Sequence, residues 1–478
     1  MKNNRLIQLL KSLTPSEFKQ FKEFVNSPFY NKNKNVISLF DYLKNFYPDF
    51  KNEKVNDEFA FRKLFPGEKY DYFKLKNIIS DLLMLGKEFI GAVHFLGDED
   101  MKTKVLLEQY RIRSLDTMHE QLYRASLKKL DDSGIRDEFY FQKLFYYSEE
   151  LKSYYSPKHP NSNFDLFQDQ LNYFVKYSII KMLRLYNTML HENKQNNYEF
   201  DLKMFDEVFH YIENNKDESN PTMIMYYYII LLEKENDEKY FFQLKRLFET
   251  HYNEFSHFDK YMYYLHMSGF CADVFNNKCR TDFTTEHFHL SKENFERGTI
   301  KLGKILYLDF LNHVKIAVRV DEYEWAEMYM EQFKNLLSDE HRQNTLNFCY
   351  GYINYKKGNL EKALDLLSRA NFSNFIIKVQ VKILLLHVYY ELGYYEQALA
   401  MIDTFRHYIQ REKGLLDDYR QSFNEYLRII NELIKIGIRI DEKGKTIIKN
   451  KIKKEIENIK YNQFGIKLWL IEKVKELK

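Results

Sequence analysis

One short region of the sequence has the residue types that metal chemistry requires. His287 and His289 are separated by a single residue, and Cys271 and Cys279 precede them. Imidazole and thiolate groups are the usual protein ligands of zinc. On a helix, residues two apart point away from each other, so these histidines could share a metal ion only in an extended loop. We therefore expect solvated or helix-capping histidines, and we predict no metal site and no cofactor.

Other catalytic chemistry finds little support in the sequence. Cys271 with a nearby histidine would make a nucleophile, but a buried structural cysteine is the more common case. The segment from Leu85 to Lys87 lacks the upstream glycine and the following Ser or Thr of a phosphate-binding loop. No H-E-x-x-H, C-x-x-C or G-x-S-x-G motif occurs, and no pair of carboxylates stands out as a catalytic dyad. We predict that the protein is not an enzyme.

The composition of the chain narrows its class further. The 478 residues carry a net charge of only +3, which gives no global argument for nucleic-acid or membrane binding. Aromatic residues make up 17%, too many for a disordered chain. Three cysteines, an odd number, favour a reducing compartment, so we expect a cytoplasmic protein. The most apolar stretch, 223–232, is about half the ~20 residues that a membrane span needs.

Glycine and proline are scarce, and their distribution predicts the fold class. The chain has 15 Gly and 7 Pro, with no Gly between Gly134 and Gly269 and no Pro after Pro221. Sheets and catalytic loops need these residues, whereas helices exclude them. Thr14-Pro15-Ser16-Glu17 has the composition of a helix N-terminus closed by a capping box. We predict an all-α protein.

A repeated pattern occurs within residues 305–412. Its last two copies have a Gly that can end a helix in a left-handed conformation, and each copy has an Ala that suits a close helix crossing. The alanines are 37 and 35 residues apart. The three copies are Asp321-x-Tyr323-x-x-Ala326, Gly358-x-Leu360-x-x-Ala363 and Gly393-x-Tyr395-x-x-Ala398.

This pattern resembles the tetratricopeptide repeat, in which two helices recur with a period near 34 residues. Residues 344–370 and 379–405 match best, and Gly351 and Ala370 occupy the small positions of the first of these copies. The first-helix Trp is absent, Leu386 replaces a small residue, and no Pro closes a repeat. The resemblance implies an α-solenoid of stacked antiparallel helical hairpins.

The whole chain also resembles an uncharacterised bacterial all-helical family, through its Ser27–Asn33 stretch and its Trp469-Leu470 ending. That resemblance implies no activity. We predict four parts in chain order. They are an N-terminal helical block (1–97), divergent helical hairpins (98–304), tetratricopeptide-like repeats (305–412) and basic C-terminal capping helices (413–478).

The resemblance further implies a concave groove lined by the first helix of each repeat. Such a groove would make the protein a scaffold or adaptor for a protein or peptide partner. The cations and tyrosines expected there suit an acidic segment or a C-terminal carboxylate group. Counting back from each Ala gives the groove residues Lys315, Arg319, Phe348, Tyr352, Tyr355, Lys356, Ile383, His387, Tyr390 and Glu391.

Two basic segments leave alternatives open. Phe29, Tyr30, Lys32 and Lys34 lie in one N-terminal loop, where aromatic stacking and phosphate contacts would make a nucleic-acid-binding regulator. The bland interpretation is a loop whose aromatic residues pack on the core. In residues 435–478, 13 Lys and Arg accompany 6 Asp and Glu around an isoleucine stripe. That segment suits either a surface-binding helix or, as we prefer, a cap on the last repeat.

Overall fold

The computed structural model describes residues 4–158, 164–196, 198–216, 220–299, 305–412, 415, 417–439 and 442–477. Every regular element in these ranges is a helix, and no strand occurs among them, so the all-α prediction is confirmed. None of the described helices has both the length and the apolar content of a bilayer span. The helices form two compact units, 1–132 with 146–164 and 133–145 with 165–478.

The first unit contains the N-terminal block and the helices that follow it directly. Thr14 accepts a hydrogen bond from the Glu17 N–H, and the Glu17 side chain accepts from the Thr14 N–H, so the predicted capping box is confirmed. Only Asp98 separates the helix that ends at Gly97 from the helix that begins at Glu99, where we predicted the end of the N-terminal block. The predicted boundary at residue 97 therefore falls inside this unit. Its helices are α1 (Arg5–Ser12), α2 (Pro15–Asn26), α3 (Lys34–Leu43), η1 (Lys44–Phe46), α4 (Asp57–Leu64), α5 (Tyr72–Gly97), α6 (Glu99–Ile112), α7 (Asp116–Asp132) and the second part of α8 (Glu138–Tyr155).

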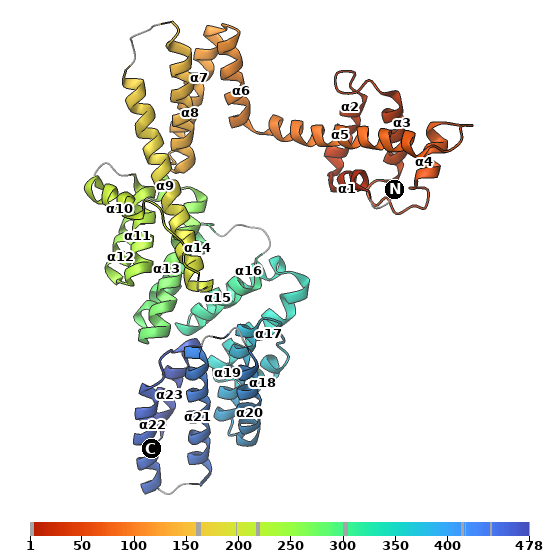
Figure 1. The fold of residues 1–478 in the computed structure, drawn as a ribbon. Coiled ribbons are helices and arrows are strands. Elements are labelled where there is room, and N and C mark those ends of the chain that lie inside the picture. Colours follow the sequence, from red (N-terminus) through yellow and green to blue (C-terminus); the bar gives the residue numbers. More distant parts are fainter. Residues whose placement is uncertain are drawn as a thin grey trace. The chain divides into compact units, whose positions relative to one another are not determined.

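The second unit begins with helices that pack in pairs, α11 against α12 and α13 against α14 (Figure 1). Between α12 and α13 lies the short helix η3 (Tyr252–Glu254). The start of α8 also belongs to this unit. These helices are α9 (Asp165–Asn196), α10 (Phe205–Asn214), α11 (Pro221–Glu235), α12 (Glu238–His251), α13 (His257–Lys278) and α14 (Asp282–Glu296).

A buried ion network joins four of these helices. The Arg184 guanidinium on α9 contacts Asp259 on α13 at 2.5 Å and Glu138 on α8 at 3.1 Å. The Tyr226 hydroxyl on α11 donates to the Asp259 carboxylate at 2.9 Å. The Lys181 ammonium on α9 also contacts Glu138, at 3.2 Å, so two cations balance the two carboxylates and the network fixes the positions of these helices. It holds the α13 helix, whose C-terminal end contributes to the site described below.

Three helical hairpins follow, and they repeat one turn geometry. The hairpins are α15 (Tyr307–Arg319) with α16 (Tyr323–Phe333), α17 (Asp339–Lys356) with α18 (Leu360–Ser368), and α19 (Phe375–Glu391) with α20 (Tyr395–Arg411). Asp321, Gly358 and Gly393 have positive φ, at 63°, 79° and 73°. The next residue in each turn donates its N–H to a carbonyl five residues earlier, at 2.9–3.0 Å. This bond ends each first helix as a Schellman motif does.

The repeated small residues lie where the paired helices touch. Ala326, Ala363 and Ala398 are fully buried. Gly351 on α17 lies against Leu367 near the end of α18, and a Cβ atom at Gly351 would come within 2.8 Å of the Leu367 side chain. The crossing of α17 and α18 therefore requires glycine on one side and leucine on the other.

The helices that follow the hairpins form a C-terminal layer. It contains α21 (Asp417–Arg439), α22 (Glu442–Glu457), η5 (Gln463–Gly465) and α23 (Ile466–Glu476). The short helix η4 (Lys334–Leu336) lies earlier, after α16. The α21 helix packs against α20. Ile452, Ile456 and Ile459 of the predicted stripe are buried in the core of this layer, while the Ile448 side chain lies outside the described residues.

The close approach at Gly351 gives a stability prediction. Gly351→Ala should destabilise the protein by roughly 1–3 kcal/mol, because the new methyl group overpacks the α17–α18 crossing. Ala363→Leu should act in the same direction for the same reason. Thermal unfolding followed by circular dichroism measures the change. Gly269→Ala on α13 is the matched control, since nothing lies within 4 Å of its Cβ position. It should be stabilising by about 0.5–1 kcal/mol. Equal melting of the Gly351→Ala variant and the parent would contradict the close crossing.

Candidate functional site

The first helices of the three hairpins form one packed row. The α15 helix packs against α17, and α17 packs against α19. The Lys315 ammonium on α15 donates a hydrogen bond of 3.0 Å to the Gln380 side-chain oxygen on α19. Because this bond joins the first and third helices of the row, Lys315 lies on a face that all three share. We call this face the inner face.

Lys315 and Arg319 form a pair of cations on the inner face. They lie one helical turn apart on α15, and both are partly buried. No carboxylate among the described residues forms an ion pair with either side chain. The Arg319 guanidinium carbon lies 4.6 Å from the centre of the Phe275 ring, near the C-terminal end of α13. Burial, with the nearby charge of Arg319, lowers the pKa of Lys315 to about 7.

The histidines near this pair carry no balancing charge. Burial and the charges of Arg319 and Lys315 lower the pKa of His287 to about 3. Burial alone lowers the pKa of His313 to about 4, and its Nδ1 atom is hydrogen-bonded to Ser291. Both rings are therefore neutral at pH 7, so the local positive charge comes from Arg319 and from the protonated fraction of Lys315.

The histidine and cysteine region of the sequence does not converge on one point. His287 and His289 belong to α14, where one is partly buried and the other is exposed. Cys271 is buried on α13, and burial raises the pKa of its thiol. Within the described part of the chain, no group of three or more His, Cys, Asp and Glu side chains could hold a metal ion.

Three of the predicted groove residues lie in the core instead. Phe348 is only 1% exposed, and Tyr352 and Ile383 are also buried. Phe348 and Tyr352 belong to a core that all three hairpins share, because α17 lies in the middle of the row and packs against both α15 and α19. These side chains are not accessible to a partner, which corrects their assignment to a groove surface.

The C-terminal helix α23 covers four more of the predicted groove residues. They are Tyr355, His387, Tyr390 and Glu391. The Trp469 Nε1–H group donates to the Tyr355 hydroxyl at 3.0 Å. The Trp469 ring stacks on His387, with ring centres 4.0 Å apart, and meets the Tyr390 ring edge-on at 5.3 Å. Burial, with Lys356 and Lys473 nearby, holds the pKa of His387 well below its usual value.

Glu391 is covered by the same helix. The Lys473 ammonium on α23 contacts the Glu391 carboxylate at 2.7 Å and the Glu476 carboxylate at 2.9 Å. Burial opposes the charge of Lys473, but the two carboxylates hold its pKa above the usual value. The inner face around Tyr355, His387, Tyr390 and Glu391 therefore already has an occupant, which is the chain itself.

Asn462 fixes the start of α23 against the end of α13. Its backbone N–H donates to the Asn276 carbonyl at 2.7 Å. Its side-chain amide donates to the Phe275 carbonyl at 3.4 Å, and its side-chain oxygen accepts from the Lys467 N–H at 2.9 Å. Asn462 is fully buried, so these bonds are shielded from water. Asn462 and Phe275 are 187 positions apart in the sequence, and this hydrogen bond joins them next to the Arg319 side chain.

Lys356 is the remaining cation of the predicted set. It ends α17, is exposed, and forms no ion pair within the described residues. Its charge acts on His387, as does that of Lys473. The accessible cations of the predicted site are thus Lys315, Arg319 and Lys356. Asn462, Trp469 and Lys473 were not predicted as site residues. Trp469 was noted only for the family resemblance of the Trp469-Leu470 ending, and the other two only lie in the basic C-terminal segment.

The N-terminal loop offers a separate surface. Asn31 is buried and donates its amide to the Val25 carbonyl at 2.8 Å, and its oxygen accepts from the Asn33 N–H at 2.9 Å. Tyr30 stacks on Phe24 with ring centres 3.9 Å apart, as the bland interpretation of this loop expects. Phe29 does not pack in this way and is 85% exposed at the tip of the loop.

Comparison with known proteins adds no relative to this description. The chain matches no family model, no curated protein and no solved structure.

The contacts of Trp469 predict that two substitutions at this position lower the stability of the fold by different amounts. Trp469→Phe keeps a ring against His387 but loses the donor to Tyr355, and should cost about 0.5–1.5 kcal/mol. Trp469→Ala also opens a cavity and should cost roughly 3–5 kcal/mol. Chemical denaturation followed by circular dichroism measures both. If the alanine variant unfolds like the parent, α23 does not cover the inner face as described.

Proposed function

We propose that the inner face of the three hairpins binds an acidic segment, or a C-terminal carboxylate group, of a partner protein. In this proposal the protein is a non-catalytic scaffold or adaptor of the tetratricopeptide-like kind. Lys315 and Arg319 are the primary contacts, and the exposed Lys356 adds a weaker one. The observation that carries the proposal is the partly buried pair of cations without a carboxylate partner.

Two unpaired cations in a partly buried position are unfavourable by themselves. Desolvation penalises each charge, and the Lys315 ammonium and the Arg319 guanidinium repel each other. A ligand carboxylate placed between them would attract both cations, which offsets the desolvation penalty and the repulsion. It would also accept hydrogen bonds from both groups. Gln380 holds the Lys315 ammonium in place, and Phe275 lies against the Arg319 guanidinium, so both cations are oriented before a ligand arrives.

The acidic-ligand proposal predicts a set of binding effects. A fluorescein-labelled peptide with an acidic, free C-terminus should bind the full-length protein. Lys315→Met and Arg319→Met should each weaken binding by about 1.5–3 kcal/mol, the value of a hydrogen bond to a charged group. Lys356→Glu should weaken it less. Lys362→Met is the control, because Lys362 is exposed on the second helix α18. Fluorescence anisotropy reports the affinity.

Stability separates a binding role from a structural role in the same variants. Lys315→Met removes an unpaired charge, so it should melt at the same or a higher temperature than the parent while losing affinity. A variant that loses both stability and affinity would indicate that Lys315 only supports the fold. Equal binding of the acidic peptide and its amidated, uncharged counterpart would overturn the proposal.

The affinity for an acidic peptide should also depend on pH. Because the pKa of Lys315 lies near 7, the side chain is charged below that pH and loses its charge above it. Binding that needs this charge should weaken by about tenfold per pH unit above pH 8. Lys315→Arg, which stays charged, should remove this dependence. A pH-independent affinity in the parent would show that Lys315 does not contact the ligand.

Nucleic-acid binding by the N-terminal block is the second candidate, and Phe29 is the observation in its favour. Its ring is exposed, the exposed Lys32 and Lys34 follow it in the sequence, and Asn31 holds the loop that carries it. If this loop binds single-stranded nucleic acid, Phe29→Ala should cost about 1–3 kcal/mol through lost stacking. Affinity for a labelled oligonucleotide should also fall steeply with salt. Tyr70→Ala in the same unit, another exposed aromatic residue, is the control.

A further inference from the structure

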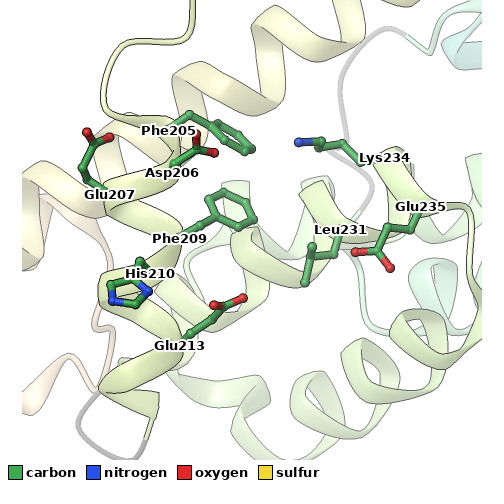
Figure 2. Close-up of a pocket in the computed structure, with 9 residues that line it drawn as sticks. All are labelled: Phe205, Asp206, Glu207, Phe209, His210, Glu213, Leu231, Lys234 and Glu235. Atoms are coloured by element: carbon green, nitrogen blue, oxygen red, sulfur yellow. The ribbon is translucent and has the colours of Figure 1, made fainter.

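A concave surface lies between α10 and α11. It has a volume of about 590 Å³, within the usual range of ligand pockets. Phe205 and Phe209 of α10 and Leu231 of α11 supply its apolar surface. In Figure 2 these side chains, together with Lys234 and the carboxylates of Asp206 and Glu213, turn toward the opening between the two helices.

The aromatic surface of this pocket already attracts a cation. Phe205 and Phe209 stack with ring centres 4.3 Å apart, and Phe209 lies 5.0 Å from the Tyr227 ring. The Lys234 ammonium lies 4.3 Å from the centre of the Phe205 ring. It forms no ion pair with a described residue and rests on the ring face instead. The pocket thus has the geometry of a cation–π site.

Carboxylates surround this site. Asp206, Glu207 and Glu213 form no ion pair with a described residue, whereas Glu235 is paired with Lys239 at 3.4 Å. Asp206 and Glu207 are exposed in the first turn of α10, and neither contacts a cation within the described part of the chain. Glu213 accepts a hydrogen bond of 2.9 Å from the Tyr227 hydroxyl, which fixes its direction. Glu235 accepts from the Tyr240 hydroxyl at 3.0 Å. The charge of Lys234 is therefore outweighed at this pocket.

Helix stability alone does not account for these acids. Asp206 and Glu207 favour the α10 helix, because negative charge at an N-terminus opposes the helix dipole. Glu213 lies in the last turn of the same helix, where the dipole makes a carboxylate unfavourable. A carboxylate kept at that end, and aimed by Tyr227, points to a cationic ligand.

We infer that this pocket binds a basic segment of a partner protein by enclosing one Lys or Arg side chain. The aliphatic stem of that side chain packs on Phe209 and Leu231, and its cation lies over the Phe205 ring between Asp206 and Glu213. Lys234 occupies part of this position in the free protein and moves aside on binding. The site is independent of the inner face, where the expected ligand is acidic.

A pair of matched peptides tests this inference on the full-length protein. One fluorescein-labelled peptide carries spaced lysines between alanines, and the other carries norleucine, which has a similar stem but no charge, at the same positions. The lysine peptide should bind at least tenfold more tightly, as measured by fluorescence anisotropy. Asp206→Asn should weaken its binding by about threefold to tenfold, and adding Glu213→Gln should weaken it further. Glutamine can still accept from Tyr227, so the helix pair should stay intact.

Lys234→Met gives the most diagnostic result. It removes the competing cation and should tighten the lysine peptide severalfold, whereas Phe205→Ala should weaken it. Glu340→Gln is the matched control, because Glu340 is an exposed first-turn carboxylate of α17. It should leave binding unchanged, as should Lys315→Met. Equal binding of the two peptides, an unchanged affinity in Asp206→Asn, or weaker binding in Lys234→Met would each overturn the inference.

Discussion

The contact between α23 and the first helices of the hairpins determines how much of the inner face a partner can reach. Trp469 covers Tyr355, His387 and Tyr390, and Lys473 neutralises Glu391. Burying Ile466, Leu470 and Val474 in the same core makes α23 an integral part of this unit. What stays accessible is the part of the face nearest α15, where Lys315 and Arg319 lie.

The two proposed ligand sites follow from opposite electrostatic situations. At the inner face, cations lack carboxylates, and the nearby histidines are neutral because burial lowers their pKa. Between α10 and α11, carboxylates exceed cations, and the single lysine lies on an aromatic ring. By contrast, the two carboxylates of Asp259 and Glu138 are balanced by two cations, Arg184 and Lys181. Uncompensated charge, and not charge density, is what distinguishes the candidate sites from the structural networks.

Local features of the fold were predictable from the sequence, because they depend on residues close together in the chain. The left-handed turns at Gly358 and Gly393, the buried alanines and the Thr14 capping box all lie within one turn or one helix pair. The α-helical class followed from the scarcity of Gly and Pro.

The candidate site was only partly predictable, since its state depends on distant contacts. Trp469 and Tyr355 are 114 residues apart, and no local pattern signals their hydrogen bond. Phe348 was placed on a surface because offsets along one helix do not reveal that both sides of α17 are packed. Lys315 and Arg319 were selected from the sequence by their charge, and their role as ligand contacts stays a prediction. The acidic pocket was missed, since Asp206 and Glu213 resemble ordinary helix-surface acids.

The position of α23 also limits how this architecture can change in length. Asn462 holds its start at the end of α13, while Trp469, a few residues later, hydrogen-bonds to Tyr355 of α17 and stacks on His387 of α19. A helix of fixed length can meet all three only if a set number of hairpins lies between them. Duplicating a hairpin there would separate these anchor points and detach one of them. Helical repeats commonly evolve by gaining and losing units, but here such a change would require the closing helix to be lengthened or lost at the same time.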